Sequence, residues 1–161
     1  MMERLARELR QANEVTAVQL PASSADATEM TIWVDFDGQG DKDQDAADPE
    51  ILTYRWEPST RLLTLTADQG GGVVTRPLLS SIVSGFSIDL YSSLWLYDAD
   101  ANGRTTWSEL DAAGPPVGNK DGQPNVELAR IDVVAISLTV LDGPHTQIYT
   151  TQVDLRNRNL N

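Results

Sequence analysis

A twelve-residue stretch, 98–109, carries oxygen-bearing side chains at the spacing of a calcium-binding loop. Calcium is a hard cation that takes about six to eight oxygen ligands, which alternating short polar side chains supply from a tightly wound chain. Gly103 at the sixth position permits the sharp turn. The expected ligands are Asp98, Asp100, Asn102, Arg104 through its backbone carbonyl, Thr106 through a water molecule, and Glu109 through both carboxylate oxygens.

The flanks of this loop differ from those of a complete EF-hand. Thr105 stands at the eighth position, where a β-branched apolar residue is usual. Residues 94–97 resemble a strand, and residues 108–112 leave room for barely one helical turn before Gly114 and two prolines. The sequence therefore predicts an isolated, EF-hand-like loop holding a structural Ca²⁺ in a β-rich domain. We favour this reading over an acidic turn that needs no metal.

A second acidic cluster lies at 35–48. No twelve-residue register in it combines a glycine at position 6 with a carboxylate at the closing position, and Lys42 lies inside it. We therefore interpret it as a solvated acidic loop, and leave open whether it binds a second cation. Its carboxylates belong to Asp35, Asp37, Asp41, Asp43, Asp45 and Asp48.

The remaining composition argues against most other chemistry. The chain has no cysteine and one histidine, His145, so thiolate sites and sites that need two imidazoles are excluded. Twelve basic and 24 acidic residues give a net charge of −12, which makes nucleic acid an unfavourable partner. No hydroxyl is paired with an evident base. We expect no enzymatic activity and no small-molecule substrate. A hydrolase that uses paired carboxylates ranks below the two non-enzymatic functions described at the end of this section.

The hydrophobic pattern has helical spacing only near the start of the chain. In residues 3–13, Leu5, Leu9 and Ala12 fall on one face. The period then changes to two, which predicts strands at 30–36, 51–56, 61–66, 82–97, 129–141 and 146–156, with a turn at 57–60, a flexible break at 70–72 and a loop at 113–125. The expected fold class is α+β, with an amphipathic helix packed on a mostly antiparallel sheet.

The order of these segments resembles a known family, the minor type IV pilins of the PilW type and the pseudopilins of the GspJ type. ERLARELRQANEV resembles the segment that follows the membrane-embedded half of the first helix in that family. The resemblance covers nearly the whole chain and lies in the order of the segments and the kinds of residue in each, with no diagnostic catalytic motif. Its further parts are MTIWVDFDG, ILTYRWEPSTRLLTL, RPLLSSIVSGFSIDLYSS, ARIDVVAISLTVLDG and TTQVDLRNRN.

The resemblance implies a single pilin-like domain over 1–161, with 1–20 as the end of a long N-terminal helix and 21–161 as a β-rich body. It also implies a basic leader and an apolar helix of about twenty residues before this segment. That helix would anchor the protein in the inner membrane, with a periplasmic domain that later reaches the pilus or cell surface. The opening Met1-Met2 fits a piece cut from such a longer chain.

The expected function is therefore that of a minor pilin or pseudopilin. It would prime or cap a type IV pilus or related filament through contacts with other minor and major pilin subunits. The sequence leaves open whether the system is a pilus, a type II secretion machine or a DNA-uptake filament. The alternative is a free-standing extracellular calcium-binding adhesion or interaction module that uses exposed aromatic residues such as Trp107.

Overall fold

The computed structural model describes residues 2–40, 42, 49–68, 72–79 and 81–155. Its elements are, in chain order, α1 (Met2–Gln11), β1 (Glu14–Gln19), β2 (Thr28–Trp33), β3 (Ile51–Glu57), β4 (Leu62–Asp68), β5 (Val73–Leu79), β6 (Val83–Ser92), the short 3-10 helix η1 (Trp95–Tyr97), β7 (Thr105–Thr106), α2 (Trp107–Ala113), the 3-10 helix η2 (Val126–Arg130), β8 (Val133–Asp142) and β9 (His145–Asp154).

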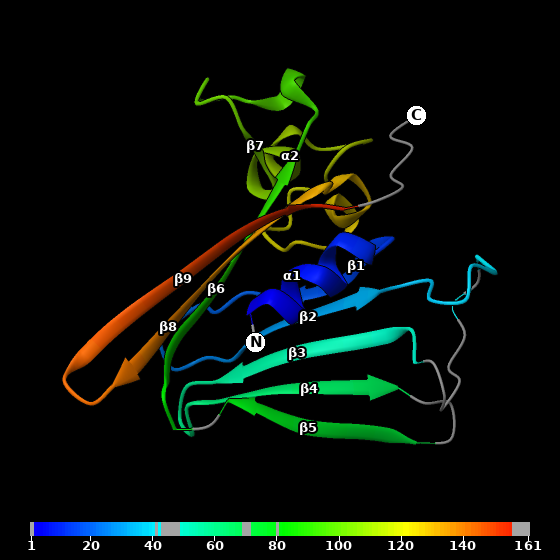
Figure 1. Cartoon of the computed structure of the whole chain (residues 1–161). Coiled ribbons are helices and arrows are strands. Elements are labelled where there is room, and N and C mark those ends of the chain that lie inside the picture. Colours follow the sequence, from blue (N-terminus) through cyan, green and yellow to red (C-terminus); the bar gives the residue numbers. More distant parts are fainter. Residues whose placement is uncertain (1, 41, 43–48, 69–71, 80, 156–161) are drawn as a thin grey trace.

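The strands form two antiparallel sheets rather than one. The first has the order β1-β2-β3-β4-β5, in which each strand pairs with its neighbours in the chain. The second has the order β7-β6-β8-β9. Figure 1 shows the two sheets crossing, with α1 in front of the first sheet and beside β9.

The expected fold class, a helix laid on one sheet with an EF-hand-like loop, is wrong. Strands make up 45% of the described residues and helices 18%, the strands divide between two sheets, and α1 is short. Period-two patterning identifies the faces of a strand, but it does not reveal which sheet the strand joins. That choice depends on long-range packing.

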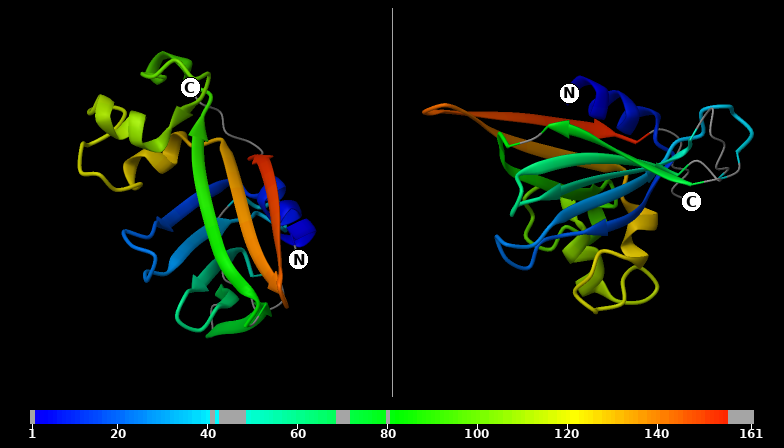
Figure 2. Two further views of the ribbon diagram at one scale, coloured as in Figure 1. Left: turned by 90° about the vertical axis from the view of Figure 1, so that its left-hand side faces the viewer. Right: turned by 90° about the horizontal axis from the view of Figure 1, so that it is seen from below.

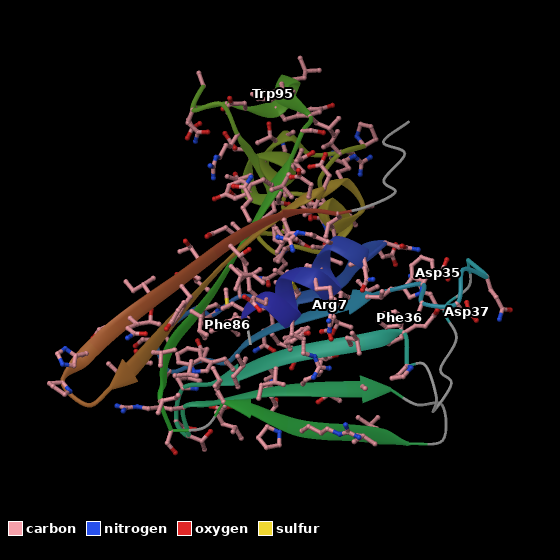
Figure 3. All side chains as sticks on the ribbon, in the orientation of Figure 1. Arg7, Asp35, Phe36, Asp37, Phe86 and Trp95 are labelled. Carbon is pink, nitrogen blue, oxygen red and sulfur yellow. The ribbon has the colours of Figure 1, made fainter. Side chains whose placement is uncertain are left out.

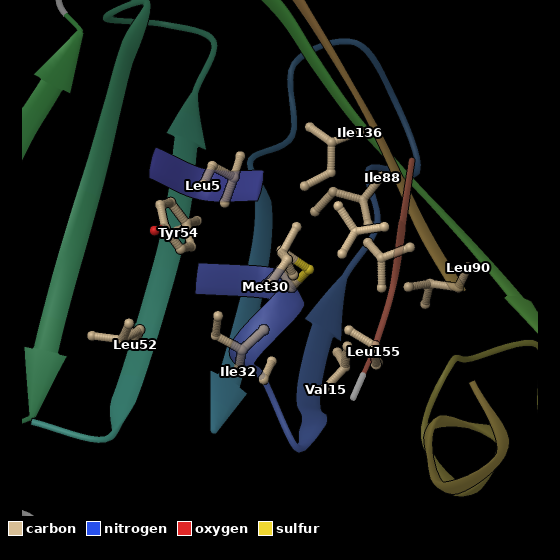
Figure 4. Close-up of a cluster of buried hydrophobic side chains, with 14 of the residues drawn as sticks. Leu5, Val15, Met30, Ile32, Leu52, Tyr54, Ile88, Leu90, Ile136 and Leu155 are labelled. Carbon is tan, nitrogen blue, oxygen red and sulfur yellow. The ribbon is translucent and has the colours of Figure 1, made fainter. Parts of the chain in front are cut away.

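The core lies between α1 and the inner faces of both sheets. Leu5 and Leu9 of α1 are fully buried, as their helical spacing predicts. They belong to the same core cluster as Met30 and Tyr54, two buried residues that face each other on the neighbouring strands β2 and β3; Figure 4 shows Leu5 with both. The second sheet contributes Ile88, Leu90 and Ile136 to the same core. Two further views show α1 lying alongside β9 at the outer edge of the second sheet (Figure 2).

The helix ends earlier than the expected 1–20 segment. It stops at Gln11, and residues 14–19 form β1, which pairs with β2. The Asn13 amide already donates to the Trp33 carbonyl at 2.9 Å, and Val15 is buried. The chain therefore pairs with the first sheet directly after the helix, so the helix cannot extend to residue 20. No helix in the described part of the chain is long and apolar enough to cross a membrane.

Most predicted strands are confirmed, with shifted ends. The strands expected at 51–56 and 61–66 are β3 and β4, joined by a turn at residues 58–61. The extended stretch expected at 82–97 is a strand only up to Ser92, and those at 129–141 and 146–156 are β8 and β9. The strands β1, β5 and β7 were not predicted. Of the expected break at 70–72, only Gly72 falls within the described residues.

Candidate calcium site

The predicted calcium loop lies at one end of the second sheet. β6 carries the chain upward to Ser92, η1 follows, and β7 returns antiparallel, pairing Thr105 with Ser92. The Thr105 hydroxyl donates to the Leu94 carbonyl at 3.0 Å, which ties the two limbs together. The loop between them is therefore closed at its base. This closure brings the first and last predicted ligands close to each other.

Three of the predicted ligands converge. One oxygen from each of Asp98, Asp100 and Glu109 lies within 4.8 Å of the others. Asp98 and Glu109 are half-buried, and Asp100 is exposed. Three carboxylates at this spacing repel one another, and a divalent cation relieves that repulsion. The oxygen-only donor set suits a hard cation such as Ca²⁺.

Backbone amides fix the carboxylate of Asp98. Its Oδ1 accepts from the Asn102 amide at 3.1 Å, and its Oδ2 accepts from the Gly103 amide at 2.8 Å. The chain can turn back this sharply because Ala101 and Gly103 have φ angles of 56° and 85°. Gly103, the predicted turn residue at the sixth position, adopts the left-handed region, which costs glycine no steric strain.

Glu109 reaches across the loop from α2. Its Oε1 accepts from the Ala99 amide at 2.9 Å, and its Oε2 accepts from the Thr106 amide at 2.8 Å. The Thr106 hydroxyl accepts in turn from the Glu109 amide, completing a capping box at the start of α2. The hydrogen bond from the Thr106 amide is the main reason that the pKa of Glu109 is lowered. The carboxylate therefore stays ionised at neutral pH.

The other three predicted ligands have visible roles of their own. The Asn102 side chain donates to Asp100 at 2.8 Å, and its Oδ1 accepts from the Arg104 amide at 2.9 Å. The Arg104 guanidinium lies 5.1 Å from the centre of the Tyr91 ring. Thr106 caps α2. Binding of a cation by all six predicted residues would require Asn102 and Thr106 to exchange some of these bonds.

The loop is not an EF-hand. It is preceded by the three-residue η1 and followed by the seven-residue α2, so the two flanking helices of that motif are missing. The helix that would precede an EF-hand loop is missing because β6 continues to Ser92 and the Ser93 amide then donates to Asp132. At the other end, Gly114 adopts a φ of 73° and ends α2. The helix α2, which contains Glu109, is seven residues long and so exceeds the single turn that the sequence predicted there.

A second group of carboxylates forms at the start of the other acidic segment. Asp35, Asp37 and Glu50 each place an oxygen within 4.8 Å of the others. Glu50 is buried and accepts from the Trp33 indole and the Phe36 amide, both at 3.0 Å. It therefore works as a structural acceptor that ties β2 to β3. Sequence reasoning missed Glu50, and its only signal was an acidic residue directly before a predicted strand.

Lys42 lies outside this carboxylate group. It forms an ion pair with Glu14, and its ammonium lies 5.2 Å from the centre of the Trp33 ring. Asp41, Asp43, Asp45 and Asp48 fall outside the described residues.

A third arrangement of acidic residues was not predicted at all. The segment expected as loop, 113–125, is held from both sides by buried carboxylates (Asp111 and Glu127). Asp111 accepts from the Asp121 and Gly122 amides, and Glu127 accepts from the Asn119 and Asn125 amides, at 3.0–3.2 Å. Backbone donors thus satisfy both side chains. Beyond Ala113, the last residue of α2, the segment contains no helix or strand, yet it is firmly anchored.

The aromatic residues divide differently from expectation. Trp107, which only the alternative function would use as a binding aromatic, is half-buried and packs against the core. Trp95 is 69% exposed and stands at the top of the molecule (Figure 3). His145 is exposed at the start of β9, next to the turn that joins it to β8. Comparison with protein-family models, with curated proteins and with solved structures gives no match for this chain.

Proposed function

We propose that this chain is the body of a minor pilin or pseudopilin, a non-enzymatic subunit that primes or caps a type IV pilus or related filament. The observation that carries the proposal is the way α1 joins the body. Leu5, Ala6 and Leu9 are buried in the common core, and α1 packs along β9. Helix and strands therefore move as one unit. A filament subunit held through its N-terminal helix needs this rigidity to present its surface to neighbouring subunits.

The proposal includes an anchor upstream of α1. In this reading an apolar helix holds the protein in the inner membrane, with the body in the periplasm and later on the pilus or cell surface. The partners are other minor and major pilin subunits. The strand-rich body that follows a single N-terminal helix supports this arrangement, together with the order of segments described above.

The gene's full reading frame and the N-terminus of the protein purified from membranes test the proposal together. We expect a basic leader that ends in glycine, followed by an apolar stretch that begins with phenylalanine or methionine and carries an early glutamate. The mature protein should begin directly after that glycine. A cleavable secretory signal with no apolar helix behind it would contradict the proposal and favour the alternative.

Calcium has a structural role in this proposal. Asp98, Asp100 and Glu109 would hold Ca²⁺, with Asn102, Arg104 through its carbonyl and Thr106 completing the oxygen set. The ion would neutralise the repelling carboxylates and fix the end of the second sheet. Because only the folded chain brings these oxygens together, binding stabilises that state by mass action. An unchanged melting midpoint in calcium and in chelator would remove this part of the proposal.

One observation favours the alternative of a free-standing interaction module. Trp95 and Leu96 are exposed beside the carboxylate cluster, as expected of a ligand-contacting surface. Crosslinking in cells separates the two proposals. Because the chain has no cysteine, a single cysteine at the exposed Arg10 position gives a clean probe. Crosslinks to other pilin subunits support the first proposal, and crosslinks only to molecules outside the cell support the second.

A further inference from the structure

The loop at 98–109 contains the sole Asn-Gly dipeptide of the chain, Asn102-Gly103. Because glycine has no β-carbon, its backbone nitrogen can approach the side chain of a preceding asparagine closely, and such asparagines lose ammonia most readily. Both residues are exposed, and a β-carbon at Gly103 would come within 4 Å of no atom beyond the neighbouring residues. Burial therefore does not protect this dipeptide, and protection has to come from its hydrogen bonds.

The loss of ammonia joins two atoms of this dipeptide. The Gly103 nitrogen gives up its proton and attacks the side-chain carbonyl carbon of Asn102, so a new C–N bond forms and the bond to Nδ2 breaks. Ammonia leaves with that proton, and a five-membered succinimide ring remains. Water then opens the ring at one of its two carbonyls. The product is aspartate, or isoaspartate, in which the main chain runs through the side-chain carbon.

The structure engages both reacting groups. The Gly103 amide donates to Asp98 Oδ2 at 2.8 Å, so a carboxylate holds the proton of the attacking nitrogen. Asn102 Oδ1 accepts from the Arg104 amide at 2.9 Å, and its Nδ2 donates to Asp100 Oδ2 at 2.8 Å. Hydrogen bonds to charged acceptors are among the stronger ones in proteins. The attack requires these bonds to break first.

The surrounding charge opposes the same step. The attacking Gly103 nitrogen has lost its proton and carries negative charge. Asp98, which holds this amide, lies in the group whose oxygens are within 4.8 Å of one another, with Asp100 and Glu109. Like charges disfavour the ionised form of a neighbouring group, so the closed loop makes the nitrogen harder to deprotonate. Since a carboxylate is far too weak a base to remove an amide proton, Asp98 keeps the proton in place.

We propose that Asn102 is a deamidation site that the closed loop keeps unreactive and that local opening of the loop releases. The reaction changes the loop permanently. Aspartate at this position adds a further carboxylate to the group, whereas isoaspartate lengthens the main chain by one carbon between Asp100 and Gly103. That extra carbon changes the spacing of Asp98 from Glu109. The inference rests neither on the pilin proposal nor on bound calcium.

Mass spectrometry of the loop peptide after incubation in mildly alkaline buffer tests the proposal, with chelator present throughout to remove any effect of a cation. In the folded wild-type chain, Asn102 should gain one mass unit roughly tenfold or more slowly than in the urea-denatured chain. Asp98→Ala releases the Gly103 proton and should speed the reaction of the folded chain roughly tenfold or more. The matched control, Asp89→Ala, removes an exposed carboxylate of β6 outside the loop and should react like the wild type.

The same samples contain internal references, because no glycine follows Asn13, Asn119 or Asn125. Circular dichroism checks that each variant is folded, and the comparison of folded with denatured wild type needs no variant at all. Equal rates in the folded and the denatured wild-type chain would overturn the proposal. An unchanged rate in Asp98→Ala would overturn it as well. So would a slower rate in that variant, because Asp98 would then act as the base.

Discussion

The loop at 98–109 and the adjoining segment 111–127 both hold carboxylates through backbone amides, but they differ in how deeply and how closely together those carboxylates lie. Both are irregular chain rich in acidic residues. In 111–127 the organising carboxylates, Asp111 and Glu127, are buried, and backbone amides occupy both oxygens of each. In 98–109 backbone amides also donate to Asp98 and Glu109, but the three carboxylates are at least partly exposed and converge on one another.

The difference teaches how to tell an acidic anchor from a candidate cation site. Amide donors alone do not distinguish the two, because Asp98 and Glu109 also accept from backbone amides through both oxygens. A buried carboxylate that accepts from amides and has no second carboxylate beside it is satisfied without an ion. Three carboxylates that crowd together near solvent carry unbalanced charge, which a divalent cation can neutralise. The comparison predicts that 111–127 responds strongly to loss of a carboxylate and weakly to calcium. The loop at 98–109 should respond strongly to calcium, and less than 111–127 to loss of a carboxylate.

Removal of Glu127 should have the largest effect. Glu127→Ala removes the buried carboxylate that accepts from the Asn119 and Asn125 amides, and a hydrogen bond to a charged group contributes about 1.5–3 kcal/mol. We expect the free energy of unfolding to fall by about 3 kcal/mol in urea denaturation. Asp121→Asn serves as the exposed control and should change it by much less. Equal losses in both variants would show that burial does not distinguish these carboxylates.

Calcium should have the next largest effect, and it should depend on Glu109. At a calcium concentration about one hundred times the dissociation constant, the wild-type chain should gain about 2.7 kcal/mol of stability. Glu109→Gln removes the carboxylate that closes the loop, so its melting midpoint should not change between calcium and chelator. Glu127→Gln lies in the anchored segment and should keep the wild-type response to calcium. A response that survives Glu109→Gln would place the ion elsewhere.

Acid should weaken the same loop without any metal. The pKa of Glu109 is lowered in the folded chain, chiefly by the Thr106 amide. Its contribution to stability is therefore fully present above the ordinary glutamate pKa of about 4.3, and it is lost as the pH falls through the lower folded-state pKa. Urea denaturation between about pH 6 and pH 3, in chelator, should show a shallower acid loss for Glu109→Gln than for wild type. Parallel curves would contradict this assignment.

The smallest effect is expected in the regular sheet. Arg55 bridges Glu29 at 3.0 Å and Glu57 at 3.2 Å across β2 and β3, with all three side chains about one third or more exposed. Such exposed pairs contribute little and are screened by salt. Arg55→Ala should lower stability by about 1 kcal/mol or less, and by less still at high salt. A larger loss would mean that exposed charges in this protein matter as much as the buried carboxylates do.

The calcium loop illustrates what could be predicted from local spacing. The positions of Asp98, Asp100 and Glu109, and the need for a left-handed Gly103, follow from residue order alone, and the structure brings these three carboxylates together. The roles of Glu50, Asp111 and Glu127 could not be predicted. Each is an isolated acidic residue in the sequence, and its amide donors become neighbours only when the chain folds.

The sequence by itself determined the local features: one amphipathic helix, strands with inward and outward faces, the turn after β3, and the spacing of the acidic loop. These depend on interactions between residues close in the chain. The tertiary structure alone decided the division into two sheets, the burial of Glu50 and Glu127, and the exposure of Trp95 in place of Trp107. Strand partners and burial depend on contacts between distant segments, and a periodic pattern carries no information about which segments those are.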